Sequence, residues 1–197
     1  MPRIAVFGGS FNPPTLAHEA IIRRCLELPQ FDEVWVLPSG SRADKAIPTN
    51  DQHRLEMLHA MHSASFADDP RLVISDFELR LPRPTETRRT IRELAVVYPD
   101  AEFWFVYGND SYRDMPNWPG AAEFMDDIRA LVFGEAAYLP AASDRLCPLP
   151  LPAEMSDVSS TAIRAAAVRG GGVGAWVSPA VASYIEQNAL YHSPAIL

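Results

Sequence analysis

RIAVFGGSFNPPTLAH, residues 3–18, joins a short apolar run to a glycine-containing loop and then to the start of a helix. The apolar residues Ile4–Phe7 predict a buried strand, and the glycine pair after them lets the backbone come close to a bound group. Thr15 is a good N-cap, because its side chain can accept a hydrogen bond from the N–H of His18. Residues three apart share a helix face, so both side chains are expected to look toward the glycine loop. Free N–H groups at the start of a helix attract anions, and the stretch therefore predicts a phosphate site.

The same order of an apolar run followed by a helical pattern continues along the chain. We expect strands at Ile4–Phe7, Glu33–Leu37, Leu72–Ile74, Phe103–Tyr107 and Ala130–Phe133, with helices at His18–Leu28, Asp51–His62 and Thr87–Val97. This alternation predicts an α/β fold, a Rossmann-like doubly wound parallel sheet with helices on both faces. Such sheets bind ligands at the carboxyl ends of their strands, where the glycine loop, Pro38–Gly40 and Gly108–Asp110 fall.

The C-terminal part, about residues 153–191, adds helices to this sheet. One is capped by Ser159-Ser160-Thr161 and runs to about Val168, and another opens at Ser178-Pro179 and reaches about Gln187. The proline-rich segment Leu139–Pro152 is expected to be an irregular loop. With no internal repeat, residues 1–197 are expected to form a single domain.

Composition narrows the class of protein. The 197 residues carry a formal net charge of −8, which argues against non-specific binding to nucleic acid or to a membrane surface. No apolar run approaches the length of a membrane span and no leader precedes the first strand, so a cytoplasmic protein is expected. Cys25 and Cys147 lack metal or redox spacing and are interpreted as reduced thiols. His53, His59 and His62 have no supporting cysteines or carboxylates, so they are interpreted as solvated helix residues rather than metal ligands.

Ser159-Ser160-Thr161-Ala162-Ile163-Arg164 forms a second candidate anion site. Its hydroxyls and N–H groups stand at the start of a helix, and Arg164 follows one turn later as a partner for phosphate. Standing alone, such a segment would be read as a plain helix cap. Together with the glycine loop it predicts a two-sided clamp on a triphosphate.

Several blocks of the chain resemble one family. Gly8–His18 resembles the signature G-G-x-F-[DN]-P-x-[HT]-x-x-H of the nucleotidyltransferase superfamily, and Ser159–Arg164 resembles its S-S-T-x-I-R segment. Arg54 opens a stretch similar to an H-R-x-x-M-L block and is interpreted as partly structural, and Gly108–Ser111 is similar to G-A-D-S. With these blocks in the expected order up to about Tyr191, the chain most resembles bacterial nicotinate-nucleotide adenylyltransferases.

The resemblance implies adenylyl transfer from ATP to nicotinate mononucleotide, which yields the dinucleotide and pyrophosphate in NAD biosynthesis. The 5′-phosphate of the acceptor would attack the α-phosphorus of ATP in line. A phosphate monoester is already anionic at pH 7, so the reaction would need positioning and charge stabilisation rather than a strong base. The expected partners are ATP and a pyridine mononucleotide. Mg²⁺ is expected to arrive with ATP, held by phosphate oxygens and water rather than by dedicated protein ligands.

The resemblance also assigns residues to roles. The catalytic residues it implies are His18, Lys45 and Arg164. The ATP-binding residues are Gly8, Gly9, Ser10, Phe11, Thr15, His18, Gly108, Asp110, Ser159, Ser160, Thr161 and Arg164, and the pyridine-nucleotide-binding residues are Asn12, Thr85, Thr87 and Trp118. In these roles His18 touches the α-phosphate, Asp110 holds a ribose and Trp118 stacks on the pyridine ring. The residues by themselves leave plainer roles open, with Lys45 on the surface, Asp110 as a helix cap and Trp118 in the core.

The chain departs from the family pattern in ways that bear on the acceptor. Thr15 stands where histidine is usual, and Arg42–Asp44 replaces a P-P-H segment. Thr85-Glu86-Thr87 replaces S-Y-T, and Pro119 follows the stacking tryptophan. Proline has no N–H to give, and a glutamate beside a carboxylate repels it, so nicotinamide mononucleotide stays open as an acceptor beside the nicotinate form.

Two other functions remain compatible with the sequence. One is a related adenylyltransferase with another phosphate-bearing acceptor, such as a phosphopantetheine adenylyltransferase. The other is a nucleotide-binding sensor without catalysis. An acceptor screen separates the first from the main hypothesis, and ATP binding without pyrophosphate release would identify the second.

Overall fold

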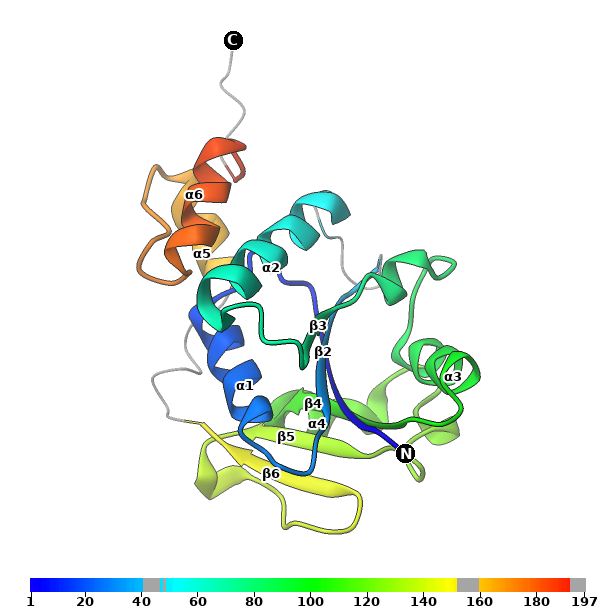
Figure 1. The fold of residues 1–197 in the computed structure, drawn as a ribbon. Coiled ribbons are helices and arrows are strands. Elements are labelled where there is room, and N and C mark those ends of the chain that lie inside the picture. The colour runs from blue at the N-terminus through cyan, green and yellow to red at the C-terminus, as the bar shows by residue number, and fades with distance from the viewer. Residues whose placement is uncertain (41–46, 48, 152–159, 192–197) are drawn as a thin grey trace.

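A six-stranded parallel sheet forms the centre of a computed structural model that describes residues 1–40, 47, 49–151 and 160–191 (Figure 1). Its strand order is β3–β2–β1–β4–β5–β6, and every neighbouring pair is parallel. The strands are β1 (Arg3–Gly9), β2 (Glu33–Pro38), β3 (Leu72–Ile74), β4 (Glu102–Gly108), β5 (Ala130–Gly134) and β6 (Leu146–Pro150). The order reverses between β1 and β4, and the carboxyl ends of these two strands are where such sheets bind ligands. The predicted Rossmann-like sheet is confirmed.

Different helices cover the two faces of the sheet. Ala5 and Phe7 of β1 belong to a hydrophobic cluster with residues of α1 (Leu16–Leu26), α2 (Asp51–Phe66), α5 (Ser160–Val168) and α6 (Pro179–Gln187). Ile4 and Val6 belong to a second cluster, which includes Leu94 of α3 (Thr87–Val97). Successive side chains of a strand point to opposite faces, so the unbroken apolar run of β1 supplies both clusters.

The main helices lie where the sequence predicts them, with shifted ends. α3 begins and ends as expected, α1 begins at Leu16 because Thr15 is its N-cap, and α2 continues past His62 to Phe66. A short helix α4 (Asn109–Asp114) follows β4. Single turns of 3₁₀-helix complete the connections: η1 (Phe77–Arg80), η2 (Met115–Asn117), η3 (Ala121–Glu123) and η4 (Ala136–Tyr138).

The proline-rich segment contains a strand, so the expectation of an irregular loop over Leu139–Pro152 was wrong. β6 pairs with β5 at the edge of the sheet, with Pro148 opposite Val132 and Pro150 opposite Gly134. The N–H of Leu151 donates to the sheet, so the prolines occupy the alternate positions whose nitrogens face the free edge. An edge strand tolerates proline there, because no neighbouring strand needs the missing N–H.

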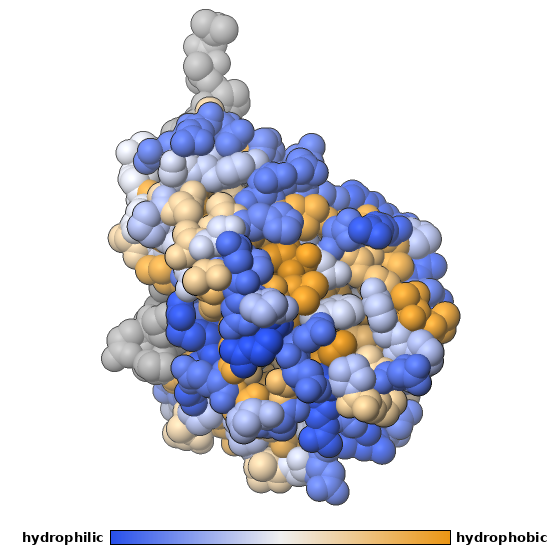
Figure 2. Space-filling view, in the orientation of Figure 1, coloured by the Kyte–Doolittle hydropathy of each residue, from blue (hydrophilic) through white to orange (hydrophobic). Residues whose placement is uncertain are grey.

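The outer surface is mixed in character. On the face drawn in Figure 2, apolar residues gather in separate patches between larger hydrophilic areas. Among the helices of the described residues, none is long and apolar enough to cross a membrane.

Candidate functional site

A pocket of about 540 Å³ lies at the carboxyl ends of β1, β2 and β4. It brings together part of the glycine loop, the end of β4 and the segments around α3 that the sequence assigned to the site. The predicted site residues in its lining are Gly8, Gly9, Ser10, Thr85, Thr87, Gly108 and Trp118. Residues far apart in the chain therefore converge on one cavity at the edge of the sheet where ligands are expected.

His18 is half-buried in the first turn of α1, where Thr15 holds its Nδ1 atom. The backbone N–H of Thr15 donates to Nδ1 at 2.9 Å, and Thr15 Oγ1 lies 2.8 Å from the same nitrogen. The hydroxyl also accepts from the N–H of His18 at 3.3 Å, which confirms the predicted N-cap. Because a backbone N–H can only donate, Nδ1 carries no proton and the proton of the neutral ring is on Nε2. Burial lowers the pKa of His18 to about 4, so at pH 7 the ring is a neutral Nε2–H donor.

The rings of Phe7 in β1 and Phe11 in the following loop pack against this imidazole. Phe11 is 1% exposed, and its φ of 45° lies in the left-handed region that residues other than glycine rarely adopt. Its ring centroid lies 5.0 Å from that of His18 and 5.4 Å from that of Phe7. A Cβ atom on Gly9 would lie 3.1 Å from the Phe11 ring, so the absence of a side chain there leaves room for the packing. The unusual loop conformation thus fixes the position of the His18 ring.

Asn12, in the middle of the loop, is held by α5 and by the segment that follows α6. Arg164 Nη1 donates to the backbone oxygen of Asn12 at 2.7 Å, and the hydroxyl of Tyr191 donates to its Oδ1 at 2.6 Å. The hydroxyl of Ser160 donates to the backbone oxygen of Pro13 at 2.9 Å. The two predicted anion sites are therefore in direct contact, as the clamp hypothesis requires.

Trp118 lies on the wall of the pocket, half-buried, and packs against the small hydrophobic cluster that contains Met115. Its ring meets Tyr107 edge to face with centroids 5.8 Å apart, and its Nε1 donates to Asp114 Oδ2 at 3.3 Å. The hydroxyls of Tyr107 and Thr85, both in the pocket lining, are buried without a hydrogen-bond partner among the described residues. Burial raises the pKa of Tyr107, so its hydroxyl keeps its proton. Unpaired buried hydroxyls are costly, and a polar ligand would satisfy them.

The N-terminus of α3 faces the same pocket, because Glu86, Thr87 and Thr90 line it. Glu86 is the N-cap residue but makes no side-chain hydrogen bond to the helix. Its carboxylate lies 3.5 Å from Arg88, which also pairs with Glu123. A cation therefore stands beside Glu86, and the first-turn N–H groups favour an anion at this end of the helix.

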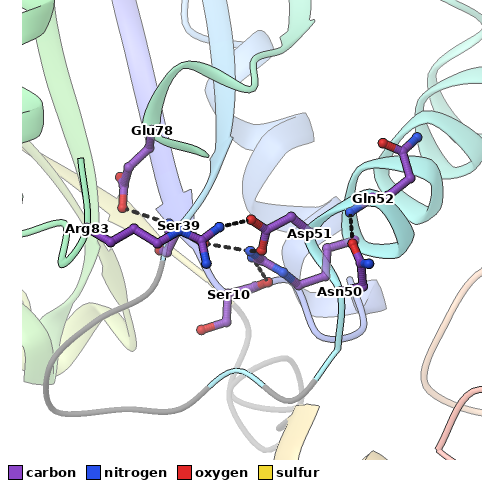
Figure 3. A network of polar contacts seen from close by, with 9 residues as sticks. Ser10, Ser39, Asn50, Asp51, Gln52, Glu78 and Arg83 are labelled. Atoms are coloured by element: carbon purple, nitrogen blue, oxygen red, sulfur yellow. Dashed lines mark hydrogen bonds and ion pairs between the residues drawn. The ribbon is translucent and has the colours of Figure 1, made fainter. Parts of the chain in front are cut away.

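Arg54 of α2 is completely buried and joins the loops that follow β1 and β2. Figure 3 shows its partners Ser10, Ser39 and Asp51 gathered in one network. Its guanidinium donates to the backbone oxygen of Ser10 at 2.9 Å and to that of Ser39 at 2.7 Å. It also pairs with Asp51 Oδ1 at 2.6 Å, and the other oxygen of Asp51 pairs with Arg83 in the loop that leads into α3. The role of Arg54 within the protein is thus structural, as expected, but its contacts are with the walls of the site.

The predicted site residues outside the pocket lining fall in different places. Most surround the loop after β1 and its contacts with α1 and α5: Phe11, Asn12, Thr15, His18, Ser160, Thr161 and Arg164. Asp110 is exposed in the first turn of α4 and does not line the pocket, although Gly108 and Ser111 do. Lys45 and Ser159 lie outside the described residues, and so does Arg42–Asp44.

The pocket also contains residues that the sequence did not assign to it. They are Val6, Phe7, Leu37, Ser39, Glu78, Thr90, Phe105, Val106, Tyr107, Ser111, Asp114, Asn117, Phe124 and Phe133. Those at the ends of β1, β2 and β4 follow from the rule that ligands bind at strand ends. Glu78 and Phe124 come from 3₁₀ turns and loops, where no periodic pattern signals which side chains face inward.

Within the described ranges, no three His, Cys, Asp or Glu side chains come together in a way that could hold a metal ion. His59 is exposed, as expected, whereas His53 lies 3.0 Å from the hydroxyl of Tyr184 and His62 contacts a backbone oxygen of the turn before β3. Cys25 and Cys147 are free cysteines.

Comparisons with known proteins agree with this geometry. The cytidylyltransferase-like family model matches residues 6–166. A protein of Shouchella clausii named "Probable nicotinate-nucleotide adenylyltransferase" is 33% identical over 195 residues, 97% of each chain. One of the same name from Thermus thermophilus is 33% identical and spans 96% of this chain and 99% of its own. The solved nicotinic acid mononucleotide adenylyltransferase of Plasmodium falciparum, complexed with NaAD, superimposes with a TM-score of 0.85 at 21% identity over 97% of this chain and 98% of that one.

Proposed function

Since the chain belongs to the nicotinate-nucleotide adenylyltransferase family, we propose that it transfers the adenylyl group of ATP to nicotinate mononucleotide in NAD biosynthesis. The observation that carries the proposal is the shared pocket. Gly8–Ser10 and the wall with Trp118 line one cavity, so a nucleotide triphosphate and a pyridine ring can be bound next to each other. Unpaired hydroxyls of Tyr107 and Thr85 in the same lining support a polar ligand.

The residues of this chain support the chemistry by orientation and charge. The 5′-phosphate of the acceptor forms a new bond to the α-phosphorus, and the bond from that phosphorus to the bridging oxygen breaks as pyrophosphate leaves. His18 offers a neutral Nε2–H, which can donate to a phosphate oxygen as negative charge grows on it. Arg164, already anchored on Asn12, supplies a fixed positive charge near the loop. Lys45 is proposed as a further phosphate contact.

Mg²⁺ is proposed to enter with ATP. The ion would be held mainly by phosphate oxygens and water. When bound, the ion would neutralise part of the triphosphate charge. The glycine loop and the helix N-termini orient the phosphates around it.

The structure supports the nicotinate form as the preferred acceptor. Pro119 removes one backbone donor, but the uncapped first turn of α3 offers others to a carboxylate. The negative charge of Glu86 is partly balanced by Arg88, so the repulsion between Glu86 and the carboxylate of the nicotinate ring is reduced.

The test is pyrophosphate release and dinucleotide formation from ATP, Mg²⁺ and either nicotinate or nicotinamide mononucleotide. We expect faster turnover with the nicotinate form. His18→Ala is expected to lower kcat by about 10²–10³, as the loss of one preorganised donor does, and to leave the circular dichroism spectrum unchanged. His59→Ala is the matched control, because His59 is an exposed histidine of α2. A His18→Ala enzyme that keeps most of its turnover would contradict the proposed role, and a preference for the amide would assign selectivity to Glu86 and Pro119.

A further inference from the structure

The buried arginine of α2 fixes two peptide groups of the pocket wall. Arg54 has no exposed surface, and its guanidinium donates to the backbone oxygens of Ser10 and Ser39. These residues follow β1 and β2, and both line the pocket. The loops are also tied directly, because the N–H of Ser39 donates to the backbone oxygen of Gly9 at 2.7 Å.

The direction of these carbonyl groups decides the direction of the next N–H groups. In a trans peptide the C=O and the following N–H point in opposite directions. Since Arg54 draws the oxygens of Ser10 and Ser39 toward α2, the N–H groups of Phe11 and Gly40 point away from α2. The N–H of Gly40 donates to Glu78 Oε1 at 3.2 Å, and Glu78 lines the pocket, which is the direction expected.

The same network extends to the loop before α3. Asp51 accepts from Arg54 with one carboxylate oxygen and pairs with Arg83 through the other. Figure 3 shows Asp51 joined to Arg83, with Ser10 and Ser39 nearby. The residues that follow Arg83, Thr85–Thr87, line the pocket near Trp118. A chain of charged contacts therefore links the glycine loop with the wall proposed to bind the pyridine ring.

We propose that Arg54 is a positioning residue, which fixes the Ser10 and Ser39 peptides at the pocket wall and, through Asp51 and Arg83, sets the distance between the two substrates. The inference rests on the proposed function, since it assigns the walls formed by these loops to the substrates of that reaction. Arg54 does not line the pocket itself, so it acts on the substrates through the Ser10–Phe11 and Ser39–Gly40 peptides. Displacement of a reacting group by about 1 Å is enough to cost about 10²-fold in rate.

The test compares Arg54→Met, Arg54→Lys and Asp51→Asn in steady-state kinetics with both substrates, at a temperature where each variant is folded. Arg54→Met is expected to lower kcat by about 10²-fold and to raise the KM for ATP. Arg54→Lys keeps a cation that reaches one carbonyl, and we expect it to recover part of kcat. Asp51→Asn still accepts from Arg54 but loses the ion pair with Arg83, so it should raise the KM for the mononucleotide several-fold and leave the KM for ATP within about two-fold.

Arg71→Met is the matched control. Arg71 also pairs with an aspartate, Asp69, and donates to a backbone oxygen. It lies just before the amino end of β3, whereas the pocket lies at the carboxyl ends of the strands. It should leave kcat and both KM values unchanged. The proposal is overturned if the Arg54→Lys and Asp51→Asn enzymes match the wild type in kcat and both KM values, or if losses simply follow the folded fraction. If the wild type forms no dinucleotide, the proposed function fails, and the affinity of each variant for a non-hydrolysable ATP analogue, measured by calorimetry, still decides the role of Arg54.

Discussion

His18 is set as a hydrogen-bond donor by the backbone of its own helix. The N–H of Thr15 donates to Nδ1, so Nδ1 must act as an acceptor. Protonation of Nδ1 would place its own N–H against that of Thr15 and break this hydrogen bond. Burial disfavours the charged form as well, and the pKa falls to about 4. The free enzyme therefore presents the same uncharged Nε2–H throughout the physiological pH range.

We predict that ¹⁵N-labelled His18 shows an unprotonated Nδ1 and a protonated Nε2 from pH 5 to pH 8. Because the unfolded chain binds this proton near its ordinary pKa of about 6.5 and the folded chain only near 4, the folded state should lose stability as the pH falls between these values. NMR titration of the ring nitrogens and urea unfolding at several pH values check both parts. A ring that titrates near 6.5 in the folded protein would contradict the assignment.

The end of β2 and the turn before α3 approach so closely that only glycine fits between them. A Cβ atom on Gly40 would lie 2.6 Å from Thr85 Oγ1 and 3.3 Å from the backbone oxygen of Glu78. Both contacts belong to residues that line the pocket. The spacing of these elements therefore sets the shape of the wall near Trp118.

Gly40→Ala should push Thr85 away from β2 and raise the KM for the mononucleotide, with a loss of about 1–3 kcal/mol in the free energy of unfolding from overpacking. Gly172→Ala is the control, since a Cβ atom there meets nothing within 4 Å. Kinetics and urea unfolding of both variants check the effect. A Gly40→Ala enzyme with unchanged KM would show that the position of Thr85 does not affect the acceptor.

The elements that the sequence predicts best are those with a strong pattern on their own. β1 and α3 begin and end close to their expected residues, because an unbroken apolar run and an amphipathic helix are local signals. β6 was missed because Pro148 and Pro150 normally argue against a strand. Only the register with β5, which is a tertiary property, shows that both prolines face the free edge.

At the scale of the whole molecule, we propose that residues 1–197 form one domain. The hydrophobic cluster that contains Phe7 of β1 also contains Ile163 of α5 and Val181 of α6, so the C-terminal helices share the core of the sheet. We predict a single unfolding transition in urea, with coincident curves from circular dichroism and tryptophan fluorescence. A separate early transition would indicate that the C-terminal helices unfold independently.

The site shows the same limit of prediction. The motifs predict roles for the glycine loop, His18, Arg164 and Trp118, because each stands in a block whose spacing is readable from sequence. The burial of the Tyr107 hydroxyl, the pairing of Arg88 with Glu123 and the two carbonyl contacts of Arg54 depend on segments that meet only after folding. Sequence patterns predict the residue types that the chemistry needs. Tertiary packing determines which polar atoms remain without a protein partner and can bind the substrates.

The contacts of Arg164 and Tyr191 with Asn12 have a consequence for synthesis on the ribosome. Arg164 is made 152 residues after Asn12, and Tyr191 is made 179 residues after it. β1 and α1 are translated early, but a nascent chain lacks the partners that fasten its phosphate loop. We therefore expect catalytic competence only after Arg164 and Tyr191 have left the exit tunnel, and we expect a translation product truncated before Arg164 to make no dinucleotide.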